Sequence, residues 1–238
     1  ALGDRHRGIG FDQLTIISDS PDADVALKFF NNDGSSAGAC GNATRCVANY
    51  EMERLGLNSL SITTERGILF ALRNNNTVSV NMGHPFLAWN EVPLAREMDT
   101  LHLPMNGSPT ATGMGNPHCT FFVENVDQVD LEAVAPDIEN DPLFPQRTNV
   151  QFVHKVSKDH LRMRVWERGV GITLASGSSS CAAAVASARL GLTGRKVKID
   201  LDGGAIYVDW REDGVWMSGD TLHVFNGTLT TQFLMSLT

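Results

Sequence analysis

An internal repeat constrains the fold of this chain more than any other feature of its sequence. Ala39-Cys40-Gly41 begins a short polar loop that ends at Cys46 and leads into a helix-forming run. Ala175-Ser176-Gly177 begins a similar loop that ends at Cys181 and leads into another. In both copies Arg-Leu-Gly-Leu follows the later cysteine at the same spacing. We expect segments this similar to share one local fold.

The residues after each loop predict the same elements in both copies. Val47–Leu55 and Ala182–Leu190 are rich in helix formers, and each is followed by a glycine suited to end a helix. A strand, a glycine turn and a hairpin come next in each copy. The pattern predicts an α+β chain of two pseudo-symmetric lobes, with residues 1–84 in the first and 85–221 in the second. Residues 222–238 are expected to return to the first lobe.

Composition and charge exclude several kinds of function. The 238 residues allow one large domain or two of about 120 residues each. A net charge of −8, from 19 Lys and Arg against 27 Asp and Glu, argues against nucleic acid or an anionic membrane as partner. No apolar run reaches the ~20 residues of a membrane span, and nothing indicates export, so we expect a cytoplasmic protein.

Motifs for metals and common cofactors are missing from the sequence. The four cysteines form no metal-ligand spacing, and no phosphate-binding glycine loop follows a strand. No lysine stands in a context that suggests pyridoxal phosphate. We therefore expect neither a metal nor a cofactor, and a small molecule as the partner.

The N-termini of the two predicted helices, called helix mouths below, are suited to acid–base chemistry. Unpaired N–H groups and the positive end of the helix dipole favour a carboxylate there, and they lower the pKa of a thiol such as Cys40. Two such mouths flanking one carbon would remove a proton from one face and return it to the other. The same turns also have a structural interpretation, because Ser and Gly commonly cap helices.

Polar motifs occur in one order along the whole chain, at Asp4–Gln13, Asn31–Ser35, Ala39–Cys46, Met114–His118, Pro145–Asn149, Trp166–Gly169 and Ala175–Ala184. Together these motifs resemble the diaminopimelate epimerase family. The resemblance covers essentially the whole chain and implies two lobes, each a barrel-like antiparallel or mixed sheet around a central helix, with the active site in the cleft between them. It also implies a cofactor-independent amino-acid epimerase that acts as a homodimer.

The resemblance also implies roles for individual residues. Cys40 matches one of the two catalytic thiols, and His118 and Glu167 match groups beside them. Gly41-Asn42 and Gly177-Ser178 match the helix mouths that receive the substrate α-carboxylate. The positions that match further substrate contacts are Gln13, Asn31, Asn116, Asn149, Glu167 and Arg168. The implied reaction converts LL-diaminopimelate to the meso isomer, on the route to lysine and peptidoglycan.

Two features depart from the family pattern. Ser176 stands where the family has its second catalytic cysteine, and Cys181 aligns instead with Cys46 as an expected packing residue. Because a hydroxyl is far less acidic than a thiol, we expect impaired and asymmetric catalysis. An inactive amino-acid-binding relative, or an epimerase or racemase of another amino acid, remains an alternative. The family's first strand and loop, with one further substrate-binding Asn, do not precede Asp4, and we expect a segment before Ala1.

Overall fold

A computed structural model describes residues 1–37, 40–74 and 77–236, and these residues form two compact units. Unit 1 consists of Ala1–Val78 and Asp220–Thr238, and unit 2 consists of Ser79–Gly219. The boundary falls within strand β6 (Thr77–Asn81). Ala39, the first residue of the first repeat motif, lies outside the described residues.

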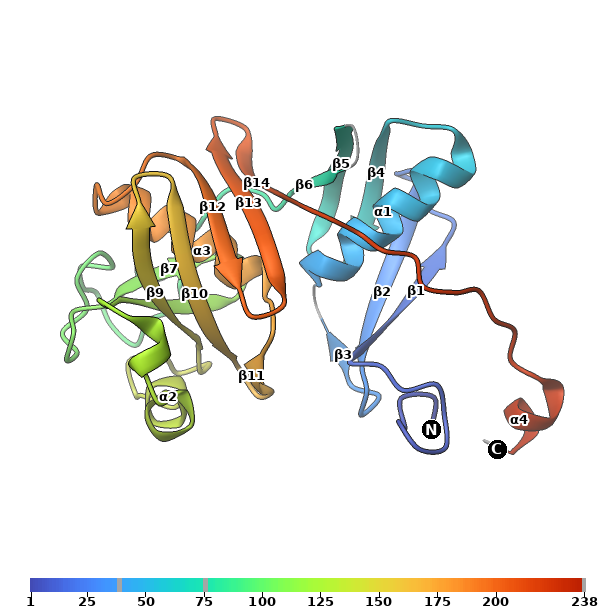
Figure 1. Cartoon of the computed structure of the whole chain (residues 1–238), viewed down its shortest axis with the longest axis horizontal. Coiled ribbons are helices and arrows are strands. Elements are labelled where there is room, and N and C mark those ends of the chain that lie inside the picture. Colours follow the sequence, from blue (N-terminus) through green and yellow to red (C-terminus); the bar gives the residue numbers. More distant parts are fainter. Residues whose placement is uncertain (38–39, 75–76, 237–238) are drawn as a thin grey trace. The chain divides into compact units, whose positions relative to one another are not determined.

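Unit 1 contains a small mixed sheet and helix α1 (Figure 1). Strand β1 pairs antiparallel with β2, and the short β3 folds back on the end of β2. The chain then forms α1 and returns as β4, parallel to β2, before β5 turns back beside it. The elements are β1 (Gln13–Ser18), β2 (Val25–Asn31), β3 (Ser36–Ala37), α1 (Gly41–Leu55), β4 (Ser59–Thr64) and β5 (Gly67–Asn74).

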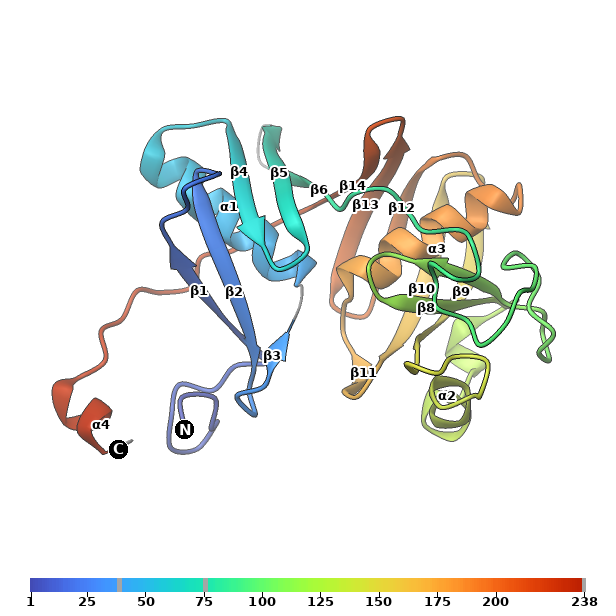
Figure 2. The ribbon, with the colours of Figure 1, turned by 180° about the vertical axis from the view of Figure 1, so that it is seen from behind.

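Unit 2 contains the same series of elements after an insertion of its own. Helix α3 packs against strands β7, β8, β9, β12, β13 and β14, so it is the central helix of this unit (Figures 1 and 2). The repeated elements are β9 (Asn149–Ser157), β10 (His160–Glu167), β11 (Gly171–Thr173), α3 (Gly177–Arg189), β12 (Lys196–Leu201), β13 (Gly204–Arg211) and β14 (Gly214–Gly219). The inserted ones are β7 (Thr110–Gly113), β8 (Pro117–Phe122), the 3-10 turn Val126–Gln128 and α2 (Leu131–Glu139).

The strand registers of the two copies agree. Val25 lies opposite Ile62 in the parallel pair β2–β4, and Leu161 lies opposite Ile199 in the parallel pair β10–β12. β11 folds back on β10 as β3 does on β2. The sequence repeat is therefore a structural repeat. The predicted α+β class with two pseudo-symmetric lobes is confirmed by this topology.

Local sequence explains where the two helices end and how α3 is buried. Gly56 after α1 has a φ of 69°, and Gly191 after α3 has a φ of 68°; a side chain rarely adopts this left-handed backbone. The predicted helix-ending glycines are thus confirmed. Within α3 the run Ala182–Ala186 is buried, and its small side chains allow the surrounding strands to approach closely.

The prediction that Cys46 and Cys181 are matched packing residues is wrong for Cys46. Cys181 is buried, whereas Cys46 is exposed. Cys46 lies one residue further from its N-cap Cys40 than Cys181 lies from its N-cap Ser176. One residue rotates a side chain by about 100° around the helix axis, which directs Cys46 to solvent. The buried Arg45 takes the position that corresponds to Cys181.

The last described helix, α4 (Thr231–Met235), is short and exposed, and it belongs to unit 1. Within the same unit, His223 contacts the ring of Tyr50 edge-on. In the described part of the chain, none of the helices has the length and hydropathy of a membrane span.

Candidate active site

The Ser176 hydroxyl lies at the N-terminus of α3 and is hydrogen-bonded to the carboxylate of Glu167. Ser176 is the N-cap residue of α3, but its Oγ donates to Glu167 Oε2 at 2.9 Å instead of capping the helix. The Thr173 hydroxyl donates to the other oxygen, Oε1, at 2.7 Å. Both oxygens of Glu167 therefore accept hydrogen bonds, which fixes the carboxylate against the buried Ser176.

Cys40 has the corresponding position in unit 1. It is the N-cap residue of α1, and the Ala43 N–H donates to its Sγ at 3.4 Å. The Thr44 hydroxyl donates to its carbonyl oxygen at 2.8 Å. An N–H donor and the helix dipole together favour the thiolate form of a cysteine. The partly buried Cys40 therefore has the surroundings expected of an acid–base thiol.

The strand pairing relates these surroundings residue by residue. Ala37 of β3 lies opposite Phe29 as Thr173 of β11 lies opposite Val165. Cys40 and Ser176 each follow at the same distance along the chain. By the same register Asn31, the last residue of β2, corresponds to Glu167, the last residue of β10. The carboxylate beside Ser176 thus has a neutral carboxamide as its counterpart in unit 1.

The predicted substrate contacts Gln13 and Asn149 begin corresponding strands. In unit 1, Gln13 Nε2 donates to Asn31 Oδ1 at 3.2 Å, and Asn31 Nδ2 donates to Ser35 Oγ at 3.0 Å. In unit 2, Asn149 Oδ1 accepts from the Arg168 N–H at 2.9 Å. Each amide therefore contacts the end of the neighbouring strand, where the candidate residues Asn31, Glu167 and Arg168 lie.

His118 is buried, and it lies between two polar side chains of unit 2. Its Nε2 is 2.9 Å from Asn116 Oδ1, and its Nδ1 is 3.4 Å from the Oγ of Ser179 in the first turn of α3. The pairing of β8 with β9 places His118 opposite Asn149. The structure therefore joins these three predicted residues to the N-terminal turn of α3, which also contains Gly177 and Ser178.

The guanidinium of Arg168 is half-buried, and its Nη1 donates to the carbonyl oxygen of Gln146 at 2.9 Å. Partial burial and the neighbouring Arg147 lower the pKa of Arg168, and Glu139 opposes that change. An arginine remains charged at neutral pH under such a shift. Arg168 is therefore a cation at a fixed position in unit 2, suited to a carboxylate ligand.

The remaining predicted residues lie in unit 1. Gly41 and Asn42 form the first turn of α1, and Asn42 Oδ1 accepts from Arg45 Nη1 at 3.0 Å. Sequence reasoning missed Thr173, Ser179 and Glu139. Thr173 and Ser179 are ordinary polar residues near a helix start, and only their hydrogen bonds distinguish them. Glu139 could not be found from spacing, because its partners lie far along the chain.

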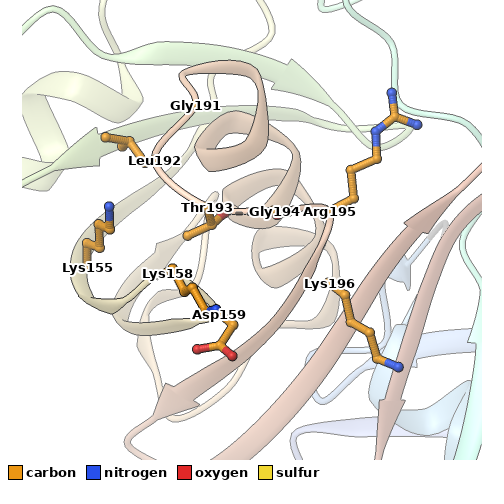
Figure 3. A pocket seen from close by; sticks show the side chains of 9 residues that line it. All are labelled: Lys155, Lys158, Asp159, Gly191, Leu192, Thr193, Gly194, Arg195 and Lys196. Carbon is orange, nitrogen blue, oxygen red and sulfur yellow. Dashed lines mark hydrogen bonds between the residues drawn. The ribbon is translucent and has the colours of Figure 1, made fainter.

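A separate hollow of about 500 Å³ lies at the C-terminal end of α3 (Figure 3). Lys155, Lys158, Arg195 and Lys196 are its basic lining residues, and the side chains of Lys155, Arg195 and Lys196 point away from one another. Arg195 stacks on Trp210, with Cζ 4.5 Å from the ring centroid. None of the predicted site residues lines this hollow, and its positive charges do not converge on one position.

Solved structures with a similar fold include a hydroxyproline epimerase and a protein of the PhzF family. A hydroxyproline epimerase from Agrobacterium vitis has a TM-score of 0.63 at 13% identity, over 87% of this chain and 72% of its own. A phenazine biosynthesis protein of the PhzF family from Bacillus anthracis has a TM-score of 0.60 at 16% identity, over 88% and 81%. At such identities the similarity shows the fold.

Sequence comparison identifies the family. The diaminopimelate epimerase family model matches residues 1–87 and 110–224. The chain is 45% identical to the diaminopimelate epimerase of Rhodospirillum centenum, over 98% of this chain and 83% of that protein. It is 47% identical to that of Gluconobacter oxydans, over 95% and 86%. The chain belongs to the diaminopimelate epimerase family, and it is an isomerase of the epimerase type.

Proposed function

We propose that the protein converts LL-diaminopimelate to meso-diaminopimelate by proton transfer at the α-carbon, for lysine and peptidoglycan synthesis. The observation that carries the proposal is the equivalence of Cys40 and Ser176, each the N-cap residue of its helix after corresponding strands. Inversion requires two groups that act on opposite faces of one carbon, and a duplicated N-cap supplies two such groups. The 45% identity to a named diaminopimelate epimerase supports the substrate.

Each predicted residue has a part in the proposed reaction. Cys40 removes the α-proton as a thiolate, and Ser176 supplies a proton to the opposite face of the carbanion. The N–H groups of Gly41-Asn42 and Gly177-Ser178 receive the α-carboxylate. Arg168 binds a substrate carboxylate, and His118 and Glu167 assist the acid–base groups. Polar side chains that complete the binding site are Gln13, Asn31, Asn116 and Asn149.

Ser176 makes the two directions of proton transfer unequal. A thiol with an ordinary pKa near 8.5 gives a usable thiolate at neutral pH, whereas a hydroxyl does not. The hydrogen bond from Ser176 to Glu167 provides a carboxylate that can accept the hydroxyl proton, but the alkoxide remains costly. Abstraction at Cys40 should therefore exceed abstraction at Ser176.

Exchange of the substrate α-hydrogen in deuterium oxide tests this mechanism. Because Cys40 can return a solvent-derived deuteron to the face it deprotonated, exchange from one stereoisomer should be much faster than inversion. Exchange from the other stereoisomer should be slow. Equal and rapid exchange from both would contradict the asymmetry, and no exchange from any diaminopimelate isomer would contradict the catalytic role of Cys40.

A second candidate function is binding of an amino acid without turnover. It is favoured by one observation, that Ser176 holds its proton in a hydrogen bond to Glu167 within a buried site. Turnover in the Ser176→Cys variant but not in the unaltered chain would show that the serine at this position causes the loss of turnover. Binding without turnover in both would support the second candidate. A third candidate, an epimerase of another amino acid, predicts exchange with that amino acid and none with diaminopimelate.

We also propose that the active protein is a homodimer. The proposal follows from the family resemblance, and sedimentation equilibrium measures it. A mass near twice the 25.8 kDa of this chain is expected. A monomeric mass in a protein that shows the predicted exchange would contradict it.

A further inference from the structure

The carboxylate of Glu139 holds the turn that carries Glu167 and Arg168. Glu139 is the last residue of α2, and only 6% of its side chain is exposed. Its Oε2 accepts from Trp166 Nε1 at 2.7 Å, and its Oε1 accepts from the Gly169 N–H at 2.9 Å. The two proposed site residues lie between these two attachment points along the chain.

The loop before β9 is tied to the same carboxylate. Arg147 Nη1 donates to Glu139 Oε1 at 3.1 Å, and Arg147 has a φ of 58°, which is unusual for a residue with a side chain. The adjacent Gln146 carbonyl is the group that accepts from Arg168 Nη1. Glu139 therefore contacts both backbone segments that fix Arg168, the turn that bears it and the loop that receives its guanidinium.

In the first copy of the repeat, hydrogen bonds within the corresponding turn close it, and no carboxylate from outside the turn is bonded to it among the described residues. There the Gly34 N–H donates to the Asn31 carbonyl at 3.0 Å, and Asp33 Oδ1 accepts from the Ser35 N–H and hydroxyl. In the second copy the Val170 N–H donates to the Glu167 carbonyl in the same way. Among the residues that the structure describes, this further attachment to a carboxylate occurs in the copy with the inserted helix α2.

We infer that Glu139 is a positioning residue for the epimerase reaction: it orders the Trp166–Gly169 turn so that Arg168 and Glu167 meet the ligand in a fixed orientation. The inference rests on the proposed function for the identity of the ligand. Three donors converge on its two oxygens, and hydrogen bonds to a charged group are stronger than those between neutral groups. Glu139 also balances the neighbouring charges of Arg147 and Arg168.

The test uses Glu139→Gln in the full chain, because glutamine keeps the volume but replaces one acceptor oxygen with an NH₂ donor. Hydrogen exchange of the Arg168 and Gly169 amides should become about tenfold faster, while the amides of β9 and α3 keep their rates. The matched control is Glu51→Gln, which alters another buried carboxylate paired with an arginine, Arg54, in unit 1. It should leave the Arg168 amide unchanged.

Affinity supplies the second measurement. Calorimetric titration with meso-diaminopimelate should show binding about tenfold weaker in Glu139→Gln and unchanged in Glu51→Gln. Unchanged exchange at Arg168, faster exchange throughout unit 2, or unchanged affinity would each overturn the positioning role. Absence of binding to the unaltered chain would overturn the proposed function, and the exchange pattern would still decide whether Glu139 orders the turn.

Discussion

Ser176 donates its hydroxyl hydrogen to Oε2 of Glu167 at 2.9 Å, although it has the N-cap position of α3. A serine at an N-cap ordinarily accepts from the backbone N–H groups of the first turn. Here its side chain makes no such bond, and it is directed to a carboxylate that Thr173 holds on its other side. The contact is what an acid–base pair requires, and it is not what helix stability alone would favour.

Replacing Ser176 with cysteine should raise the rate of epimerisation. A general acid–base group typically contributes about 10²–10⁴-fold, so a gain within that range is expected in kcat for inversion. Circular dichroism of diaminopimelate measures the inversion directly. The control is Ser157→Cys, which adds a thiol at an exposed strand end and should change nothing. An unchanged, measurable rate would contradict the expected role of residue 176, and binding without turnover in both proteins would argue for the binding protein described above.

Replacing Cys40 with alanine should abolish α-hydrogen exchange from the stereoisomer that the unaltered chain exchanges rapidly. The loss should be at least about 10²-fold, because no other group replaces the thiolate. Nuclear magnetic resonance of the substrate in deuterium oxide measures it. The Cys46→Ala variant alters the exposed cysteine of the same helix and should keep the full exchange rate. Equal losses in the two variants would point to damage to α1 instead of chemistry.

Replacing Arg168 with lysine should weaken substrate binding more than it slows chemistry. A lysine keeps the charge but loses the planar pair of donors that a carboxylate accepts, so KM should rise about tenfold with kcat nearly unchanged. Steady-state kinetics of the Ser176→Cys background provide the measurable rate. Arg162→Lys is the control, because Arg162 lies on β10, the strand that ends just before Arg168, and pairs with Asp202. A fall in kcat at constant KM would contradict the binding role.

Asp24 should make the stability of unit 1 depend on pH in the acid range. The Ser61 N–H and hydroxyl each donate to Asp24 Oδ2 at 2.7 Å and lower the pKa of this exposed carboxyl below its ordinary value. Its stabilisation is therefore complete above the ordinary pKa near 3.9 and is lost as pH falls through the lowered pKa. Because solvent screens this exposed carboxyl, Asp24→Asn should lower the free energy of unfolding by less than about 1 kcal/mol at pH 7 and by still less at pH 2.

Urea denaturation followed by far-ultraviolet circular dichroism at the two pH values measures this difference. Asp22→Asn is the control for the change of charge, since no hydrogen bond to its carboxylate is found in the described residues. A penalty for Asp24→Asn that stays constant from pH 7 to pH 2 would contradict the role of the ionised carboxylate.

The repeat allowed most of the architecture to be predicted, because helix formers, glycines and hairpins recur in one order in both copies. The prediction for Cys46 failed because a one-residue difference near the helix start rotates a side chain without altering the pattern of residue types. Contacts between distant segments were also beyond the sequence. Glu139 reaches Trp166 and Gly169 through the packing of α2, and no local spacing encodes that approach.

The hydroxyl of Ser176 also determines which protonation state of the resting enzyme can start the reaction. A two-thiol epimerase alternates between two forms, with the proton on one sulfur or on the other, and each form accepts one stereoisomer. A serine hydroxyl keeps its proton at neutral pH, so in the proposed mechanism the Cys40 thiolate is the form of the enzyme that removes a proton. The other stereoisomer then reacts slowly and competes for the site, while the equilibrium between the isomers is unaffected.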